Sequence, residues 1–555
     1  MCAEYWSIMR NTVNCTGLLK RLTALVLVIS LMAGFAQAES FDDLMMAAQQ
    51  DPMAMENIEW VQLPSGINTD AELKLGYVSQ PGAQVNPFLC TDRDLVSLNQ
   101  MVFEPLVELD DSFKPTPMLA DSWSNDGETW TFKLRQGVVF HNGASLTAAD
   151  VLLSYQSFLA AGESNPYYSR LQLIESLDAT DEFTVTVQSK VSGYVTLYAM
   201  TFPIVQHSTL SESMARGTGP YWYTEYVPGA GVRLEANPLW WKKDTQIHSI
   251  AAICYADSGD ALEALGTKQI DLLCTQSSNA SFSRKMSAYT SMDYLTTTYE
   301  MIVPNLNETS LMSDVRIRQA VMYAIDRALI AENAYLGMGI QCEVPVNPGS
   351  WLYESQSAIY YHSPERALQL LQGCGWQDLT GDGMLNQIEG VRLKDLTLRL
   401  ITYNDATTSV RENAAYLIAD CLKKVGVNVE IEVRGRERCL RYIKEGNYDI
   451  ALVGVNLSEV PDLNQLLGSR GNINLNNYGT DAMNTLLDQV ETAQTEDELK
   501  SIYSQIQMLV VERLPVLGIL FRTGTVLSRR SLAGLSGIRS SNTLNGIEFM
   551  ENTVE

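Results

Sequence analysis

A twelve-residue stretch that begins at Asp378 carries carboxylates at the spacing of a calcium-binding loop. Asp378, Asp382 and Glu389 stand at its first, fifth and twelfth positions, and Gly383 stands at the sixth, where such loops turn sharply. Thr380 occupies the third position, where Asp or Asn is usual. Asp-Gly turns of this kind also occur as plain loops. The pattern therefore favours either a calcium site formed by the three carboxylates or a surface turn without an ion.

Catalytic chemistry finds little support in the sequence. The four histidines are scattered singly, at His141, His207, His248 and His362. No pair of metal-ligating histidines, nucleophile elbow or phosphate-binding glycine loop occurs. We therefore expect a protein that is not an enzyme and that has no cofactor apart from the calcium alternative. A secreted hydrolase is the rival from another class, and it would need a nucleophile and a base paired in one cleft.

Three arginines alternate with other residues at the end of a predicted strand over 427–433. They are Arg434, Arg436 and Arg438. A guanidinium group binds a carboxylate through two parallel hydrogen bonds, so Arg434 is a candidate contact for an anionic group of a ligand. The alternative is a solvated strand end, where charged side chains commonly lie.

Alternating strands and helices must position these side chains. Apolar residues at every second position predict a strand at 73–77, and a turn between two such runs predicts a hairpin over 123–134. Thr147, with Asp150 three residues later, is typical of a capping box that opens a helix ending near Phe158. Further predicted elements are helices at 95–106, 318–335, 411–425 and 499–513 and strands at 183–188 and 427–433. Because the elements alternate and no internal repeat is visible, the predicted fold class is α/β with several sheets.

Composition and charge limit the classes of protein. The chain has 555 residues, of which 46% are hydrophobic and 19% charged, so it is globular and long enough for two or more lobes. Its formal net charge of −26 argues against nucleic acid and against an anionic membrane surface as the main partner. An acidic excess of this kind most often keeps a soluble protein dispersed.

The first residues have the pattern of an export signal. Basic residues precede an apolar run over 22–35, which is too short for a comfortable membrane span, and Ala36 and Ala38 supply small side chains for cleavage. We predict a signal peptide at 1–38, cleaved after Ala38, and a periplasmic or secreted product. No cysteine follows the apolar run, so no lipoprotein is expected; an uncleaved anchor is the alternative. Residues 39–70 are predicted to be an N-terminal extension with a short helix and a linker.

Seven of the nine cysteines follow the predicted cleavage site. An odd number in an exported protein predicts at least one free thiol or an intermolecular bridge. Cys254 with Cys274, and Cys421 with Cys439, are candidate pairs, but spacing alone cannot decide whether the geometry permits a bond.

A series of short motifs runs in order through about residues 70–525. The most distinctive are FKLRQGVVFHNG at 132–143, GTGPY at 217–221 and NPLWW at 237–241. The others are NPF at 86–88, VFEPLV at 102–107, PMLADSW at 117–123, LTAADV at 146–151, DVRIRQA at 314–320 and AIDR at 324–327. Together they resemble the extracellular solute-binding proteins of family 5, which include dipeptide-, oligopeptide- and nickel-binding subunits of ABC importers.

The resemblance implies a two-lobed periplasmic binding protein fold of type 2, similar to cluster C, with an extra subdomain. Two strands would cross between the lobes, and a hinge motion would trap solute between them. The implied domains are lobe I from 71–110, 212–298 and 521–555, the extra subdomain from 111–211, and lobe II from 299–520.

The resemblance also implies which residues face the cleft. A buried Glu104 would accept a cationic group of the ligand, and aromatic side chains would form a planar wall. Core packing is the alternative for Tyr221 and Trp351. The candidate ligand contacts are Phe103, Glu104, Tyr221, Trp222, Trp351, Tyr403, Asn404, Arg434, Ser458 and Glu459.

One position departs from the family pattern. Peptide-binding members often carry an Asp, four residues before the Pro equivalent to Pro461, that pairs with the free amino end of the ligand. Leu457 stands there in this chain, and Ser458 and Glu459 are close but in another register. The usual amine anchor is therefore absent from its expected position.

The function implied is that of the solute receptor of an ABC importer for peptides or peptide-like solutes. It would deliver its solute to a membrane permease that works with an ATPase subunit. The alternatives are another solute, such as a nickel complex or an oligosaccharide, and a sensory or chaperone-like role without transport.

Overall fold

The computed structural model describes residues 72–80, 82–242, 245–405 and 408–551. The predicted signal peptide and the whole predicted N-terminal extension lie outside the described residues. Among the described residues, no helix is long and apolar enough to cross a membrane.

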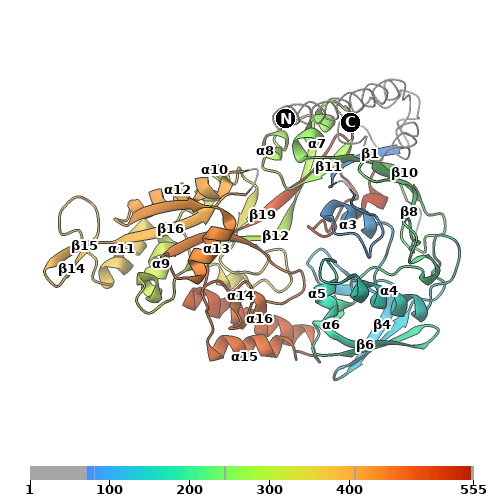
Figure 1. Ribbon diagram of the computed structural model, residues 1–555, viewed down its shortest axis with the longest axis horizontal. Coiled ribbons are helices and arrows are strands. Elements are labelled where there is room, and N and C mark those ends of the chain that lie inside the picture. Colours follow the sequence, from blue (N-terminus) through green and yellow to red (C-terminus); the bar gives the residue numbers. More distant parts are fainter. Residues whose placement is uncertain (1–71, 81, 243–244, 406–407, 552–555) are drawn as a thin grey trace, which may run out of the picture.

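One eleven-stranded sheet runs through the whole molecule. Its strands follow the order β17-β16-β18-β12-β19-β11-β1-β10-β9-β8, and β13 pairs separately with β19. The strands are β1 (Glu72–Val78), β8 (Tyr221–Val227), β9 (Gly231–Ala236), β10 (Ser249–Tyr255), β11 (Leu272–Thr275), β12 (Thr290–Pro304), β13 (Gly339–Gln341), β16 (Thr397–Tyr403), β17 (Asn428–Arg434), β18 (Ile450–Asn456) and β19 (Leu517–Ser528). We use lobe I for the part around β1 and β8–β11, including the chain after β19, and lobe II for the part around β16–β18 (Figure 1).

The two longest strands, β12 and β19, connect the lobes. They pair antiparallel with register shifts between Leu295 and Tyr299 and between Glu300 and Met301. In lobe II, β12 also pairs with β18, and in lobe I the end of β19 pairs with β11. The two strands therefore cross from one lobe to the other, as the resemblance implies. The residue boundaries given above for the domains stay a prediction.

A separate four-stranded antiparallel sheet, β4-β5-β7-β6, forms the extra subdomain with α4 against it. Its strands are β4 (Ala120–Asp126), β5 (Thr129–Leu134), β6 (Ile174–Asp181) and β7 (Thr184–Ser189). The predicted hairpin over 123–134 is confirmed by β4 and β5. The predicted capping box is confirmed too, because the Thr147 amide and hydroxyl donate to one oxygen of Asp150 at 2.9 and 2.8 Å.

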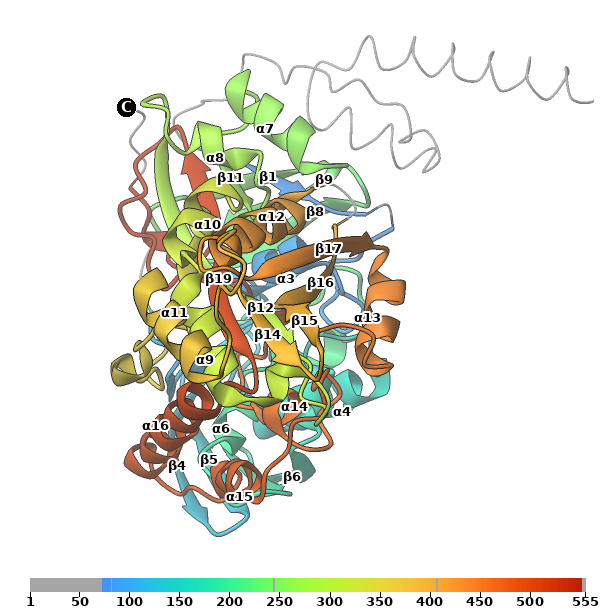
Figure 2. The ribbon, with the colours of Figure 1, turned by 90° about the vertical axis from the view of Figure 1, so that its left-hand side faces the viewer.

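Helices cover the faces of the large sheet, fill lobe II and pack within the subdomain (Figures 1 and 2). They are α3 (Arg93–Gln100), α4 (Ala148–Ala161), α5 (Tyr168–Leu171), α6 (Thr196–Ala199), α7 (Ser258–Gly266), α8 (Ala280–Ser283), α9 (Val315–Ala324), α10 (Arg327–Asn333), α11 (Pro364–Gly373), α12 (Val410–Lys423), α13 (Arg436–Lys444), α14 (Asn464–Leu467), α15 (Asp481–Val490) and α16 (Glu496–Arg513). The short strands β2 (Val107–Leu109) and β3 (Pro115–Pro117) pair with each other, as do β14 (Asn386–Glu389) and β15 (Arg392–Asp395). The strands predicted at 73–77, 183–188 and 427–433 and the helices predicted at 411–425 and 499–513 are confirmed by β1, β7, β17, α12 and α16.

Two helix predictions were wrong in extent. The helix predicted over 318–335 is divided into α9 and α10, because Ile325 is extended and the carboxylate of Asp326 accepts the Leu329 amide at 2.9 Å to start a new helix. The helix predicted over 95–106 ends at Gln100. The chain after it leaves the helix because the carbonyls of Met101 and Val102 accept amides from the segment that leads into β8.

The candidate disulfide pairs were wrong. All seven cysteines among the described residues are free, and six of them are buried. Cys254 lies on β10 and Cys274 on β11, with β1 between them in the sheet. Burial raises the pKa of the Cys90 thiol to about 12 and that of Cys254 to about 11, so these thiols are poorly reactive.

Candidate functional site

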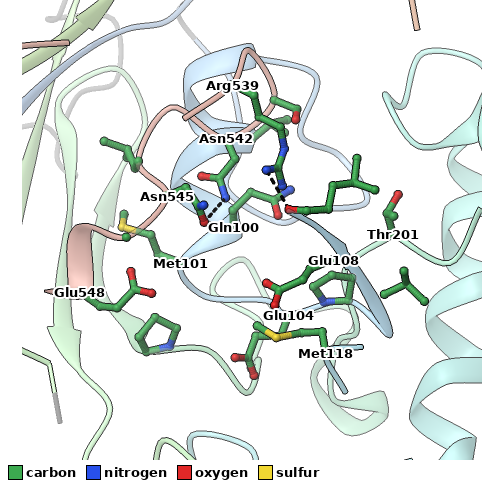
Figure 3. A pocket seen from close by; sticks show the side chains of 18 of the residues that line it. Gln100, Met101, Glu104, Glu108, Met118, Thr201, Arg539, Asn542, Asn545 and Glu548 are labelled. Carbon is green, nitrogen blue, oxygen red and sulfur yellow. Dashed lines mark hydrogen bonds between the residues drawn. The ribbon is translucent and has the colours of Figure 1, made fainter. Parts of the chain in front are cut away.

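The central cavity lies where lobe I, the subdomain and lobe II meet, and has a volume of about 250 Å³. Lobe I contributes the end of α3 and the C-terminal segment 536–549, the subdomain contributes residues 166–170, and lobe II contributes Glu459. Figure 3 shows Gln100, Glu104, Arg539 and Asn542 around this space. The cavity therefore collects side chains from three parts of the chain that are far apart in sequence.

Two other cavities lie between the lobes. The hinge cavity, of about 380 Å³, is lined by Val78 and residues 274–278 of lobe I, by Asp405 of lobe II and by Arg522 on β19. The small cavity, of about 60 Å³, contains Ser458 and shares Glu459 with the central cavity. The space between the lobes thus contains three cavities, of which the hinge cavity and the small cavity touch the crossing strands.

Four side chains of the central cavity have hydrogen-bonding atoms left over, those of Arg170, Glu459, Arg539 and Asn542. Glu459 accepts from the Ser541 hydroxyl at 2.7 Å through one carboxylate oxygen, and Arg539 donates through Nη1 to the carbonyl of Leu109 at 3.1 Å. The other oxygen of Glu459, Nε of Arg539 and Oδ1 of Asn542 are buried and have no partner among the described residues. Buried polar atoms usually have partners, so these atoms are available to form hydrogen bonds with a bound molecule.

A second arginine, Arg170 of the subdomain, also lines the central cavity. Arg170 donates to the Thr201 hydroxyl at 2.6 Å, and its guanidinium lies 5.3 Å from the ring centre of Tyr167. Nε of Arg170 is likewise buried without a partner in the described parts of the chain. Burial raises the pKa of Tyr167, whose hydroxyl accepts from Gln100 at 2.7 Å, so this ring stays neutral. The central cavity thus combines the guanidinium groups of Arg170 and Arg539 with several carboxylates. The glutamates in its lining are Glu104, Glu108, Glu459 and Glu548.

Glu104 lines the central cavity, but its carboxylate is already occupied. It accepts from the indole N–H groups of Trp240 and Trp241 at 3.0 and 2.8 Å and from the Thr218 hydroxyl at 2.7 Å. Burial raises its pKa against the opposing effect of these donors. Phe103 beside it is fully buried in the core. The structure therefore places Glu104 in the cavity lining with its oxygens bonded to protein donors, and Phe103 in the core. Ligand contact by either residue stays a prediction.

The predicted aromatic wall is not assembled in any of these cavities. Tyr221 is fully buried and donates its hydroxyl to the carbonyl of Ile247 at 2.8 Å. Trp222 lies beneath the guanidinium of Arg216, 4.9 Å from it, and does not line a cavity described above. Trp351 also lies outside their linings and contacts the subdomain. These aromatic side chains pack against the protein itself.

Among its described residues, the loop that begins at Tyr403 reaches the hinge cavity through Asp405 and Thr408. The ring of Tyr403 is buried 4.4 Å from the guanidinium of Arg411. Asn404 donates to Glu412 at 2.6 Å. Tyr403 and Asn404 thus support the loop, and Asp405 and Thr408 line the cavity.

A buried ion network that sequence reasoning missed lies behind this loop. Glu300 on β12 accepts from Arg411 at 2.9 and 3.0 Å and from Arg522 at 2.6 Å, and both arginines also bind Asp405, at 3.0 and 3.2 Å. Burial favours the neutral form of Glu300, but the positive charges of Arg411 and Arg522 outweigh it and lower its pKa. The network therefore holds two positive and two negative charges where β12, β19 and α12 meet.

The remaining predicted contacts differ in outcome. Arg434 pairs with Glu432 on its own strand, and its guanidinium lies 5.3 Å from the Tyr442 ring, outside the linings of the three cavities. Ser458 lines the small cavity, where its hydroxyl accepts the amide of Val460 at 3.0 Å. Of the predicted set, Glu459 is the residue with an unused buried atom in the central cavity. Arg539 and Asn542 were missed because the C-terminal segment has no regular pattern.

The candidate calcium loop forms a hydrogen-bonded turn. Both oxygens of Asp378 accept backbone amides, from Gly381 at 2.7 Å and Gly383 at 3.0 Å, and these bonds lower its pKa. Glu389 pairs with Lys394 at 3.2 Å across the β14–β15 hairpin. In the part of the chain that the structure describes, no three acidic, histidine or cysteine side chains are gathered to hold a metal ion. Asp378, Asp382 and Glu389 are thus not brought together, and calcium binding stays a prediction.

Comparison with known proteins identifies relatives over most of the chain. The chain is 23% identical over 468 residues to the oligopeptide-binding protein AppA of Bacillus subtilis, covering 80% of this chain and 85% of that protein. It is 25% identical over 459 residues to heme-binding protein A of Haemophilus influenzae, covering 75% of this chain and 81% of that protein.

Solved structures show the same fold. A nickel ABC transporter structure from Bacillus halodurans matches with a TM-score of 0.74 at 18% identity, covering 86% of this chain and 99% of that chain. NikA from Brucella suis in complex with Fe(III)-EDTA matches with a TM-score of 0.70 at 19% identity, covering 87% and 100%. The fold is the two-lobed periplasmic binding protein fold of type 2, cluster C. Because the family model of the bacterial extracellular solute-binding proteins, family 5 (middle region), matches residues 114–475, more than half of the sequence, the chain belongs to that family.

Proposed function

We propose that the protein binds a short peptide or a peptide-like solute in the central cavity and delivers it to the permease of an ABC importer. Membership of a solute-binding family supports the general role. The peptide class is supported by relatives named for oligopeptides and for di- and tripeptides, which match 80% and 82% of this chain. Binding without catalysis is part of the proposal, so a bound peptide is expected to be recovered intact.

The observation that carries the proposal is the set of unused polar atoms in the central cavity. The free oxygen of Glu459 and the amide oxygen of Asn542 can accept hydrogen bonds, and Nε of Arg539 can donate one. A peptide offers matching groups, because it has an ammonium end, backbone N–H donors and carbonyl or carboxylate acceptors. One oxygen of the half-buried Glu459 carboxylate is buried without a partner among the described residues, so a cationic group there would be favoured.

Glu459 is the proposed amine anchor in place of the absent aspartate. It stands two residues after Leu457, where peptide-binding relatives often carry an Asp. Its side chain nevertheless reaches the central cavity, held by the hydrogen bond from Ser541 at 2.7 Å. Because Ser541 belongs to lobe I and Glu459 to lobe II, an amine bound here would contact a carboxylate that is oriented by both lobes.

Native mass spectrometry of the purified protein, followed by calorimetric titration with di- to pentapeptides, tests the proposal. The expected result is a co-purified peptide or at least one peptide that binds. Glu459→Gln, which keeps the side-chain size but removes the charge, is expected to weaken binding by about tenfold or more. Glu445→Gln, at an exposed lobe II glutamate outside the cavity linings, is the matched control and should bind normally.

A peptide whose amino end is acetylated provides a second control, because it lacks the cationic group. It should bind the wild type about as weakly as the free peptide binds Glu459→Gln. The proposal fails if no peptide binds, or if a nickel complex or an oligosaccharide binds while peptides do not.

A further inference from the structure

The subdomain and lobe II hold each other at the end of the molecule opposite the crossing strands. Figures 1 and 2 both place the subdomain strands β4 and β6 beside α15 and α16, away from β12 and β19. We call this contact the clasp, formed by residues 112–114 and 192–198 of the subdomain and by Trp351 and residues 491–496 of lobe II.

The first part of the clasp is a pair of backbone hydrogen bonds. The amide of Gly193 donates to the carbonyl of Glu491 at 2.9 Å, and the amide of Tyr194 donates to that of Ala493 at 2.6 Å. A Cβ on Gly193 would lie 2.6 Å from the oxygen of Glu491, closer than Cβ contacts occur. Glycine at 193 thus permits the two chains to approach.

The second part is centred on Trp351. Its backbone amide donates to the carbonyl of Ser112 at 2.9 Å, and its indole N–H donates to the hydroxyl of Tyr198 at 3.0 Å. That hydroxyl in turn donates to the carbonyl of Phe113 at 3.0 Å. The ring of Tyr194 meets Trp351 edge to face at 6.1 Å between ring centres. Trp351, predicted to be a ligand contact, thus binds the subdomain.

The third part is ionic and borders solvent. Glu496, the first residue of α16, accepts from the hydroxyl of Tyr194 at 2.9 Å and from the ammonium group of Lys114 at 2.5 Å. The side chains of Lys114 and Glu496 are 34% and 43% exposed, so water can replace each partner when the contact separates. Lys114 also lies 5.8 Å from the ring centre of Trp351, which links this part to the second.

The solute space lies between the clasp and the hinge. The small cavity is lined at the crossing strands by Thr297 and Phe521 and at the clasp by Phe113 and Tyr198. It shares Glu459 with the central cavity. The two lobes are therefore joined on both sides of these cavities, by continuous strands on one side and by side chains and a few backbone bonds on the other.

We propose that the clasp is the part of the interlobe contact that releases when the lobes open, and that its strength sets how long a solute stays bound. The crossing strands cannot separate without breaking their backbone pairing on both sides of the register shifts, whereas the clasp consists of polar groups that can return to water. The assignment rests on the proposed function, because a solute must occupy the interlobe space for the clasp to control its release. It gives the subdomain a defined part in the closing of the lobes.

Pulsed electron-spin distance measurements on the solute-free protein test this role. Spin labels on Ser176→Cys in the subdomain and Lys500→Cys on α16, both exposed positions, would report the separation across the clasp. Cys374→Ser removes the one thiol among the described cysteines that is not buried. Lys114→Met and Glu496→Gln each remove one charged partner of the clasp. Glu512→Gln, near the other end of α16 and paired with Arg513, is the matched control.

The labelled wild type and Glu512→Gln are expected to show mainly one short distance. Lys114→Met and Glu496→Gln should each raise the ratio of long to short distances by about two- to fivefold, the effect of losing a partly exposed ion pair. Unchanged distributions in both variants would overturn the proposal, as would equal opening in the control. Lys114 lies outside the helices. Lys114→Met therefore still tests whether loss of the clasp contact opens the lobes, even if Glu496→Gln disturbs the start of α16.

This test is separate from that of the proposed function, because it uses no ligand. A protein that binds no peptide but opens in the two clasp variants would contradict the proposed solute and support the clasp. A protein that binds peptides but shows no opening in the variants would support the proposed solute and contradict the clasp.

Discussion

Replacing Arg411 by methionine is a severe test of the ion network at the hinge. The side chains of Arg411 and Glu300 are 3% and 0% exposed, and Arg411 makes two of the three arginine hydrogen bonds that Glu300 accepts. Methionine fills much of the same volume without a charge. The variant therefore leaves a buried carboxylate with Arg522 as its remaining arginine partner.

The expected cost follows from the burial of this pair. Breaking a buried ion pair by removing one partner costs about 3–5 kcal/mol, because the other charge stays buried. Arg522 still donates to Glu300 at 2.6 Å, so the lower end, about 3 kcal/mol, is expected. Arg316→Met is the matched control, since Arg316 pairs with Asp314 on the surface, where a pair contributes about 0–1 kcal/mol.

Urea unfolding at neutral pH, followed by tryptophan fluorescence, measures both variants against the wild type. Arg411→Met should lower the free energy of unfolding by about 3 kcal/mol, and Arg316→Met by less than about 1 kcal/mol. The reasoning is refuted if Arg411→Met loses no more stability than Arg316→Met.

The same network makes the free energy of unfolding depend on pH. The arginines lower the pKa of Glu300 and of Asp405 below their ordinary values of 4.5 and 3.8, in each case against the effect of burial. A carboxylate with a lowered pKa in the folded state stabilises the fold above its ordinary pKa and loses that effect as the pH falls through the folded value. The stability advantage of the wild type over Glu300→Gln should therefore be full at neutral pH and shrink in acid below about pH 4.

Four further predictions follow from other features. Gly217→Ala should destabilise the protein by about 2–3 kcal/mol in urea unfolding, because a Cβ there would lie 1.9 Å from the carbonyl oxygen of Val102; no loss would show that the backbone relaxes freely. Brief treatment of the native protein with a maleimide should modify Cys374 first, as mass spectrometry of its peptides would show, and rapid modification of the buried cysteines would contradict their burial. If residues 378–389 form an ion site, calorimetric titration with calcium should show binding that Asp378→Asn abolishes, and the absence of heat would show that the turn is a surface loop without an ion. Intact-mass analysis of the exported protein should show cleavage after Ala38, and an uncleaved mass would contradict the signal peptide.

Local signals in the sequence predicted much of the fold. The capping box of Thr147 and Asp150 was predicted because both partners lie within one helical turn. Asp326 is also a local signal for a helix start, yet the apolar spacing continued across it, so two helices were predicted as one. Periodicity reports which face is buried, and it is weaker at marking where one helix stops and the next begins.

The candidate site was less predictable because it is built from distant segments. Glu459 was found through its position relative to Pro461 in the family pattern, although its neighbour Leu457 occupies the usual anchor position. Arg539 and Asn542 belong to a segment without periodic structure, and only the fold brings them beside Glu459. Glu300 in an apolar strand was a usable signal for a buried charge, but nothing local indicated that Arg411 would pair with it.

The crystal structure of the protein with a bound peptide tests the central claim most directly. It is predicted to show the peptide in the central cavity, with its ammonium group hydrogen-bonded to the free oxygen of Glu459 and with a carbonyl or carboxylate oxygen at Nε of Arg539. A peptide bound only in the hinge cavity, or one whose ammonium group avoids Glu459, would contradict the account.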